Sequence, residues 1–116
     1  MLADDERVIA LRARLSADLR TAMKSRDMDS AGAVRTLLSR LDQASAVPLT
    51  REHAATSAGP SEVQRRFLTW NEATALLSDE IAEKRRAIAT FADLNMAAEV
   101  SRLTHQLHAM ESYIAE

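Results

Sequence analysis

The residues best suited to hold an anionic ligand form a short basic run, Lys-Arg-Arg, at positions 84–86. Lys and Arg side chains neutralise phosphate groups, and Lys24, Arg26 and Arg40 could contribute to the same patch. The chemistry would be the binding of nucleic acid and not catalysis. The residues that we predict to contact nucleic acid are Lys24, Arg26, Lys84, Arg85 and Arg86.

A solvated helix face is the alternative interpretation of the same basic run. Asp79, Glu80 and Glu83 precede it on one predicted helix, so the local charge is nearly neutral. Glu80 lies one helical turn before Lys84 and is its expected ion-pair partner. The charge balance along this helix favours the solvated face over a dedicated phosphate patch.

Two histidines offer a second possible chemistry, the coordination of a metal ion. His105 and His108 are three residues apart, and Glu111 follows one turn later. Leu107 and Met110 define the apolar side of this helix, which turns both histidines outward, and no further ligand is evident. We therefore expect two exposed histidines without a partner, and neither a metal ion nor another cofactor. The sequence also contains no nucleophile motif and no Gly-rich phosphate loop, so we predict no catalytic residues.

Composition excludes several classes of protein. The chain has 116 residues, a formal net charge of −2 and no Cys, so it is long enough for one domain and has no disulfide, Cys-bound zinc or thiol chemistry. The small net charge argues against a strongly basic nucleic-acid binder but allows a local patch. No apolar run approaches the roughly 20 residues of a membrane span, and the acidic N-terminus does not resemble a signal peptide. We expect a cytoplasmic protein that does not bind membranes.

The elements that position these residues are predicted to be helices throughout. Ala and Leu dominate, and apolar residues recur at spacings of three and four. The polar break at 27–30 is short, so the first two helices should be antiparallel neighbours. Both prolines fall within 46–69, which we predict to be a crossover loop with a short helix at 61–68. The fold class is an all-α four-helix bundle of two antiparallel hairpins in a single domain, with helices at about 4–26, 29–45, 70–92 and 95–115.

Local signals predict how two of the helices begin. Thr69 and Glu72 fit a capping box at the start of the third helix. Asp93 or Asn95 is the expected cap of the last helix. The bulkiest core candidates are Phe67, Trp70 and Phe91.

The last helix has the most regular apolar pattern in the chain. Its apolar positions are spaced 4, 3, 4, 3 and 4, the heptad pattern of helices that pack side by side. Such a seam indicates packing, and part of it could extend into a partner, including a second copy of the chain. The seam consists of Met96, Val100, Leu103, Leu107, Met110 and Ile114.

Three stretches of the chain resemble the YqeY-like (GatB/YqeY) family. Residues 15–27, with the sequence Ala-Met-Lys near their end, are similar to the family's opening helix and turn. Residues 34–41 resemble its second helix. Residues 65–91 combine a Leu-Thr helix start, a Glu-Lys-Arg-Arg run and a later aromatic residue, as the family's third helix does.

The resemblance implies the N-terminal four-helix domain of that family without the C-terminal tail, which is similar to the tail of a tRNA amidotransferase subunit and carries the association with tRNA. It also implies a relation to carbon–nitrogen ligase activity with glutamine as amido-N-donor, although no catalytic residue is identifiable. We therefore expect a non-enzymatic helical binding module that associates with tRNA or a tRNA-modifying protein. The alternatives are a structural or oligomerisation module that uses the last helix, and an accessory subunit of a glutamine-dependent carbon–nitrogen ligase.

Overall fold

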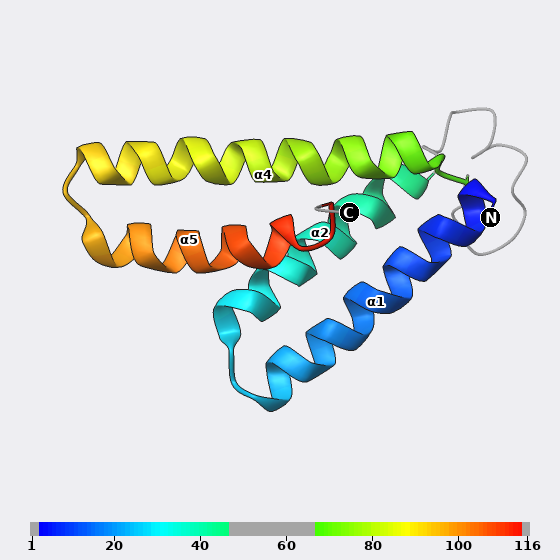
Figure 1. Cartoon of the computed structure of the whole chain (residues 1–116), viewed down its shortest axis with the longest axis horizontal. Helices are drawn as coiled ribbons and strands as arrows, with labels where there is room; N and C mark the ends of the chain where they lie inside the picture. Colours follow the sequence, from blue (N-terminus) through cyan, green and yellow to red (C-terminus); the bar gives the residue numbers. More distant parts are fainter. Residues whose placement is uncertain (1–2, 47–66, 115–116) are drawn as a thin grey trace, which may run out of the picture.

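The computed structural model describes residues 3–46 and 67–114 of the chain, and within these ranges it contains helices and no strands. Figure 1 shows two antiparallel hairpins, as the sequence predicts. The predicted crossover loop and most of the predicted short helix lie outside the described residues. The described residues form four helices, α1 (Asp4–Lys24), α2 (Met28–Ser45), α4 (Trp70–Asp93) and α5 (Ala97–Glu111).

The predicted capping box at the start of α4 is confirmed. The backbone N–H of Glu72 donates to Oγ1 of Thr69, and the backbone N–H of Thr69 donates to Oε1 of Glu72, both at 3.1 Å. At the start of α2, the side chain of Asp27 accepts a hydrogen bond of 3.1 Å from the backbone N–H of Ser30. These side chains satisfy backbone donors that a helix cannot pair internally.

The predicted cap of the last helix is wrong. Residue 96 occupies the N-cap position of α5, and no side chain caps this end. Asn95 instead ends α4: its φ is 57°, and the N–H of Met96 donates to the carbonyl of Phe91 at 2.9 Å. This is a Schellman motif, in which one residue adopts the left-handed conformation. Asn tolerates that conformation, so its role in ending α4 prevailed over capping α5.

The two hairpins cross obliquely and α2 packs against the other three helices, with the core between them (Figure 1). Phe67, a predicted core residue, is 81% exposed, whereas the neighbouring Leu68 is buried. Leu68 directly precedes Thr69, the N-cap of α4, and an apolar side chain at that position packs back on the helix, so Leu68 and not Phe67 enters the core. Trp70 and Phe91 are partly buried. The largest fully buried side chains are Leu15, Leu37, Leu41, Leu77, Ile81 and Met110.

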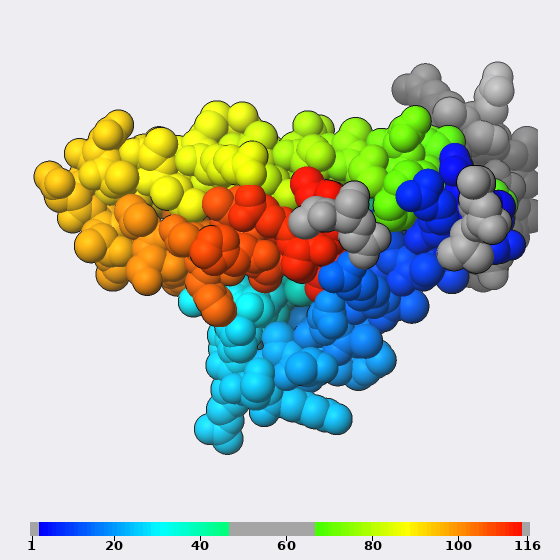
Figure 2. Space-filling model, in the orientation of Figure 1, coloured from blue at the N-terminus to red at the C-terminus, as the bar shows by residue number. Residues whose placement is uncertain are grey.

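The crossing leaves the two hairpin turns as separate protrusions. Figure 2 shows the α1–α2 turn at the bottom of the view and the α4–α5 turn at the left. Within the α4–α5 turn, every residue from 92 to 98 is exposed. None of the described helices is long and apolar enough to cross a lipid bilayer.

Candidate functional site

The five predicted nucleic-acid contacts do not form one patch. Lys24 and Arg26 lie at the α1–α2 turn, and the run at 84–86 lies in the second half of α4. In Figure 1, α5 lies between that turn and α4. The structure therefore divides the predicted site into two basic regions with different surroundings.

The region on α4 is partly neutralised by other helices. Nη2 of Arg85 lies 2.6 Å from Oε2 of Glu111 on α5. The expected pair between Glu80 and Lys84 is wrong: Glu80 is 8% exposed and faces α2, where its Oε1 lies 3.1 Å from Nε of Arg40. A carboxylate buried between helices needs a nearby cation, and α2 supplies it. Arg40 therefore belongs to the core boundary and not to a phosphate patch.

The region at the α1–α2 turn contains two further cations that the sequence analysis missed. Arg20 lies one helical turn before Lys24 on the same face of α1, and both are exposed. Arg35 reaches across from α2, where its Nη2 lies 3.7 Å from Sδ of Met23. We refer to Arg20, Lys24, Arg26 and Arg35 together as the basic end.

No carboxylate of the described residues forms an ion pair with any of the four cations of the basic end. The nearest acid in sequence, Asp27, is engaged elsewhere: both of its carboxylate oxygens lie 3.0 Å from Nε2 of His105 on α5. Its hydrogen bonds with the Ser30 side chain, with His105 and with the Ser30 backbone lower the pKa of Asp27 to about 2. The acid is therefore ionised but faces α2 and α5.

This arrangement corrects the expectation for His105. The residue is exposed, as predicted, but it does have a partner, because Oγ of Ser30 also lies 3.2 Å from its Nε2. The contact joins the start of α2 to the middle of α5 and holds the two hairpins together at the basic end. No group of three His, Cys, Asp or Glu side chains within residues 3–46 and 67–114 is arranged to hold a metal ion.

The backbone of Arg26 is in a conformation that normally favours glycine. Its φ is 60°, and the N–H of Asp27 donates to the carbonyl of Ala22 at 2.9 Å, so α1 also ends in a Schellman motif. A side chain in the left-handed conformation costs about 1–2 kcal/mol. In return for this cost, the turn carries a long, exposed cationic side chain.

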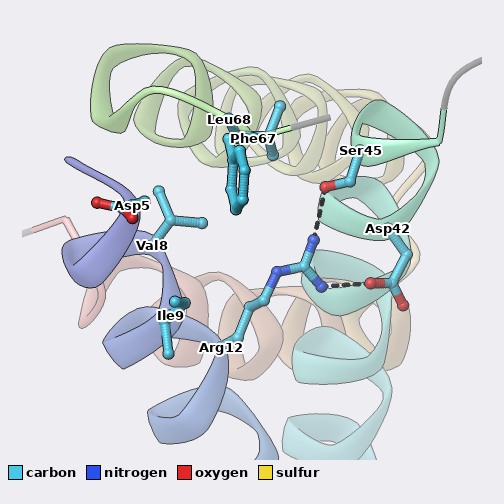
Figure 3. A pocket seen from close by; sticks show the side chains of 8 residues that line it. All are labelled: Asp5, Val8, Ile9, Arg12, Asp42, Ser45, Phe67 and Leu68. Atoms are coloured by element: carbon cyan, nitrogen blue, oxygen red, sulfur yellow. Dashed lines mark hydrogen bonds and ion pairs between the residues drawn. The ribbon is translucent and has the colours of Figure 1, made fainter. Parts of the chain in front are cut away.

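A pocket at the opposite end of α1 has different chemistry. Figure 3 shows Arg12 reaching across it to Asp42, with its Nη2 2.7 Å from Oγ of Ser45. Ser45 in turn donates to the carbonyl of Leu41 at 2.7 Å. The remaining lining is mainly apolar and includes the exposed Phe67. The guanidinium is thus bound within the protein, and the described residues that line the pocket include no aligned nucleophile and base.

The two missed cations differ in how far they could have been predicted. The spacing of four between Arg20 and Lys24 is visible in the sequence and places both on one helix face. The approach of Arg35 to Met23 depends on how α1 and α2 are aligned in the hairpin, which no local pattern specifies.

Comparisons of the chain with family models, with curated proteins and with solved structures found no match. The relation to the YqeY-like family therefore stays a prediction that depends on the three stretches described above.

Proposed function

We propose that this chain is a non-enzymatic binding module that contacts the phosphates of a structured RNA, such as tRNA, through its basic end. The observation that carries the proposal is the group of four exposed cations without a carboxylate partner among the described residues. Unpaired cations on flexible stems attract phosphates and release counterions when they bind.

The neighbouring side chains favour contacts to the RNA backbone over contacts to bases. Met23 and Met28 are the exposed apolar residues at this end, and no aromatic residue lies between positions 20 and 35. Proteins that hold unpaired bases stack them on aromatic rings, which this end lacks. The proposed ligand is therefore recognised by its phosphates and shape, with little dependence on sequence.

The conformation of Arg26 supports the same proposal. A glycine would relieve the cost of the left-handed backbone, so an arginine at this position sacrifices stability. Backbone strain of this kind is concentrated at functional sites. A charged side chain at the tip of the turn has a direct use if an anionic ligand binds there.

The test is the salt dependence of tRNA binding, measured by fluorescence anisotropy between 50 and 200 mM salt. Four phosphate contacts predict a slope of log affinity against log salt of about −3, a loss of about 60-fold over this range. Lys24→Glu combined with Arg26→Glu should halve the slope and weaken binding by at least about tenfold. Lys84→Glu combined with Arg86→Glu changes the net charge equally and should have a much smaller effect.

Three results would contradict the proposal. They are undetectable binding at 50 mM salt, binding that is independent of salt, and an equal loss in both charge-reversal variants. An acidic protein is another ligand that the same cations could attract. A pull-down with and without nuclease separates the two classes, because a protein partner remains bound after the RNA is digested.

A second candidate function, a protein-interaction module that uses α5, is favoured by an independent observation at the other hairpin turn. Met96, at the start of the apolar seam of α5, is 42% exposed, and Val100 is partly exposed.

A further inference from the structure

One face of α2 carries a hollow whose described lining comes from this helix alone. Its volume is about 380 Å³, which is within the range of sites that hold small molecules. The lining residues recur at intervals of three and four positions, so they follow one side of the helix. They are Gly32, Arg35, Thr36, Ser39, Arg40 and Gln43.

The hollow adjoins the basic end, because Arg35 belongs to both. The second guanidinium of the lining, that of Arg40, is neutralised by Glu80, whose Oε1 lies 3.1 Å from Nε of Arg40. No carboxylate of the described residues lines the hollow itself. A ligand whose phosphate is held by Arg35 can therefore extend along α2 over groups that add no net charge.

The free hydrogen-bonding groups of the hollow are uncharged. The side chains of Ser39 and Gln43 are exposed and form no hydrogen bond with a described residue, whereas the hydroxyl of Thr36 donates to the carbonyl of Gly32 at 3.0 Å. A hydroxyl and a carboxamide can both donate and accept hydrogen bonds. Phosphate oxygens only accept, so this pair of side chains suits a hydroxyl group of the ligand better than a second phosphate.

A buried amide beside Gly32 also lacks a donor. Gln106 of α5 is 8% exposed, and its Oε1 has no hydrogen-bond partner among the described residues. A Cβ on Gly32 would lie 3.7 Å from Nε2 of Gln106, so the amide adjoins this end of the hollow. Buried polar atoms are nearly always paired, and the group missing here is one that donates a hydrogen bond.

The glycine at this end is not required by the packing of α2 on α5. A distance of 3.7 Å is an ordinary contact, so alanine would fit at position 32. Alanine would also favour the helix, since glycine is the less stable of the two in a helix interior. What glycine provides is a backbone that a ligand can approach closely.

We propose that the hollow receives the two riboses that flank a phosphate held by Arg35, one beside Gly32 and one beside Ser39, so that the protein prefers RNA to DNA. This inference rests on the proposed function, because the basic end must first hold the phosphates. The 2′-hydroxyl of ribose both donates and accepts, and DNA lacks it. One hydrogen bond to each ribose should favour RNA by about tenfold in total.

Three ligands test the preference by fluorescence anisotropy at one low salt concentration. They are an RNA hairpin, the DNA hairpin of the same sequence, and the RNA hairpin with 2′-O-methyl groups. The methylated RNA keeps the RNA helix shape but loses the hydroxyl donor, which separates the hydroxyl from the shape. The wild-type protein should bind the unmodified RNA about tenfold more tightly than either of the others.

Two variants of the hollow should each reduce this preference to about threefold, because each removes the contacts to one ribose. Ser39→Ala combined with Gln43→Ala removes no charge, so the slope of log affinity against log salt should not change. Gly32→Ala places a methyl group beside the Gln106 amide, and it should raise Tm by about 2–5 °C while it lowers the preference. Asn71→Ala combined with Ser78→Ala, at exposed positions of α4, is the control and should keep the full preference.

The outcomes distinguish failure of this proposal from failure of RNA binding itself. Equal affinity for RNA and DNA, a preference that survives 2′-O-methylation, or an unchanged preference in either hollow variant would overturn the ribose contacts and leave the phosphate contacts of the basic end in place. Undetectable binding of all three hairpins would overturn both proposals. Lys24→Glu combined with Arg26→Glu should weaken RNA and DNA equally, so a loss at the basic end leaves the ratio of the two affinities unchanged.

Discussion

Replacing Arg26 with glycine should make the protein more stable and at the same time a weaker RNA binder. Arg26 has a φ of 60°, where a side chain costs about 1–2 kcal/mol and glycine costs nothing. Glycine also loses more conformational entropy on folding, which opposes the gain by about 0.5–1 kcal/mol. The net increase in the free energy of unfolding should therefore be about 0.5–1 kcal/mol.

Thermal and urea denaturation followed by circular dichroism measure this gain. For a domain of this size, 0.5–1 kcal/mol corresponds to an increase in Tm of about 2–5 °C. The urea midpoint should rise while the slope of the free energy against urea stays constant, because the buried surface does not change. In the same protein, the affinity for tRNA should fall, and the slope of log affinity against log salt should become shallower by the amount expected for one lost phosphate contact.

Two variants separate the backbone effect from the charge effect. Arg26→Ala removes the charge but keeps the strained conformation, so it should weaken RNA binding without raising Tm. Asn95→Gly changes the corresponding position of the other hairpin turn, where Asn already tolerates the left-handed conformation. It should give a smaller gain in stability and leave RNA binding unchanged. The reasoning fails if Arg26→Gly lowers Tm, or if its RNA binding equals that of the wild type.

Three further predictions concern the fold. Because hydrogen bonds lower the pKa of Asp27 from 3.8 to about 2, its ionised form stabilises the folded chain above about pH 4, and this contribution is lost as the pH falls towards 2. In Asp27→Asn, the free energy of unfolding should therefore fall less steeply than in the wild type between about pH 4 and pH 2. Arg40→Ala leaves the carboxylate of Glu80 between helices without its cation, so it should lower the free energy of unfolding, measured in urea, by about 2 kcal/mol. Replacing both Arg40 and Glu80 with Met should restore most of this loss. Leu77→Ala empties a fully buried site and should cost about 3 kcal/mol, whereas Phe67→Ala, at an 81% exposed residue, should change stability by less than about 0.5 kcal/mol; similar costs for the two would contradict the assignment of the core.

Features that depend on neighbouring residues in the sequence were predicted best. The four helices and the capping box of Thr69 and Glu72 follow from apolar spacing and from backbone donors near the helix start. The end of α4 was the exception. Asn95 can cap the next helix or adopt a left-handed conformation that ends the previous one, and residue type alone does not decide between these roles.

Features that depend on the packing of one hairpin on the other could not be read from local patterns. Glu80 has a cation one turn away on its own helix, yet it pairs with Arg40 because its position on α4 faces α2. His105 lies on the outer side of the α5 seam, but the crossing angle brings it to the side chain of Asp27. The candidate site changed for the same reason, since only the alignment of α1 with α2 brings Arg35 beside Met23.

The net charge of −2 does not describe the electrostatic field at the basic end. Asp4, Asp5 and Glu6 lie in the first turn of α1, and at 1.5 Å per residue its 21 residues place them about 30 Å from Lys24. This separation is more than three times the screening length of about 8 Å at physiological salt. Neutralising Asp4 and Asp5 as Asn changes the formal charge from −2 to 0 (−2 + 2), yet it should leave the salt slope of tRNA binding unchanged. A steeper slope in that variant would show that total charge, and not the four cations at the end of the hairpin, governs the attraction of RNA.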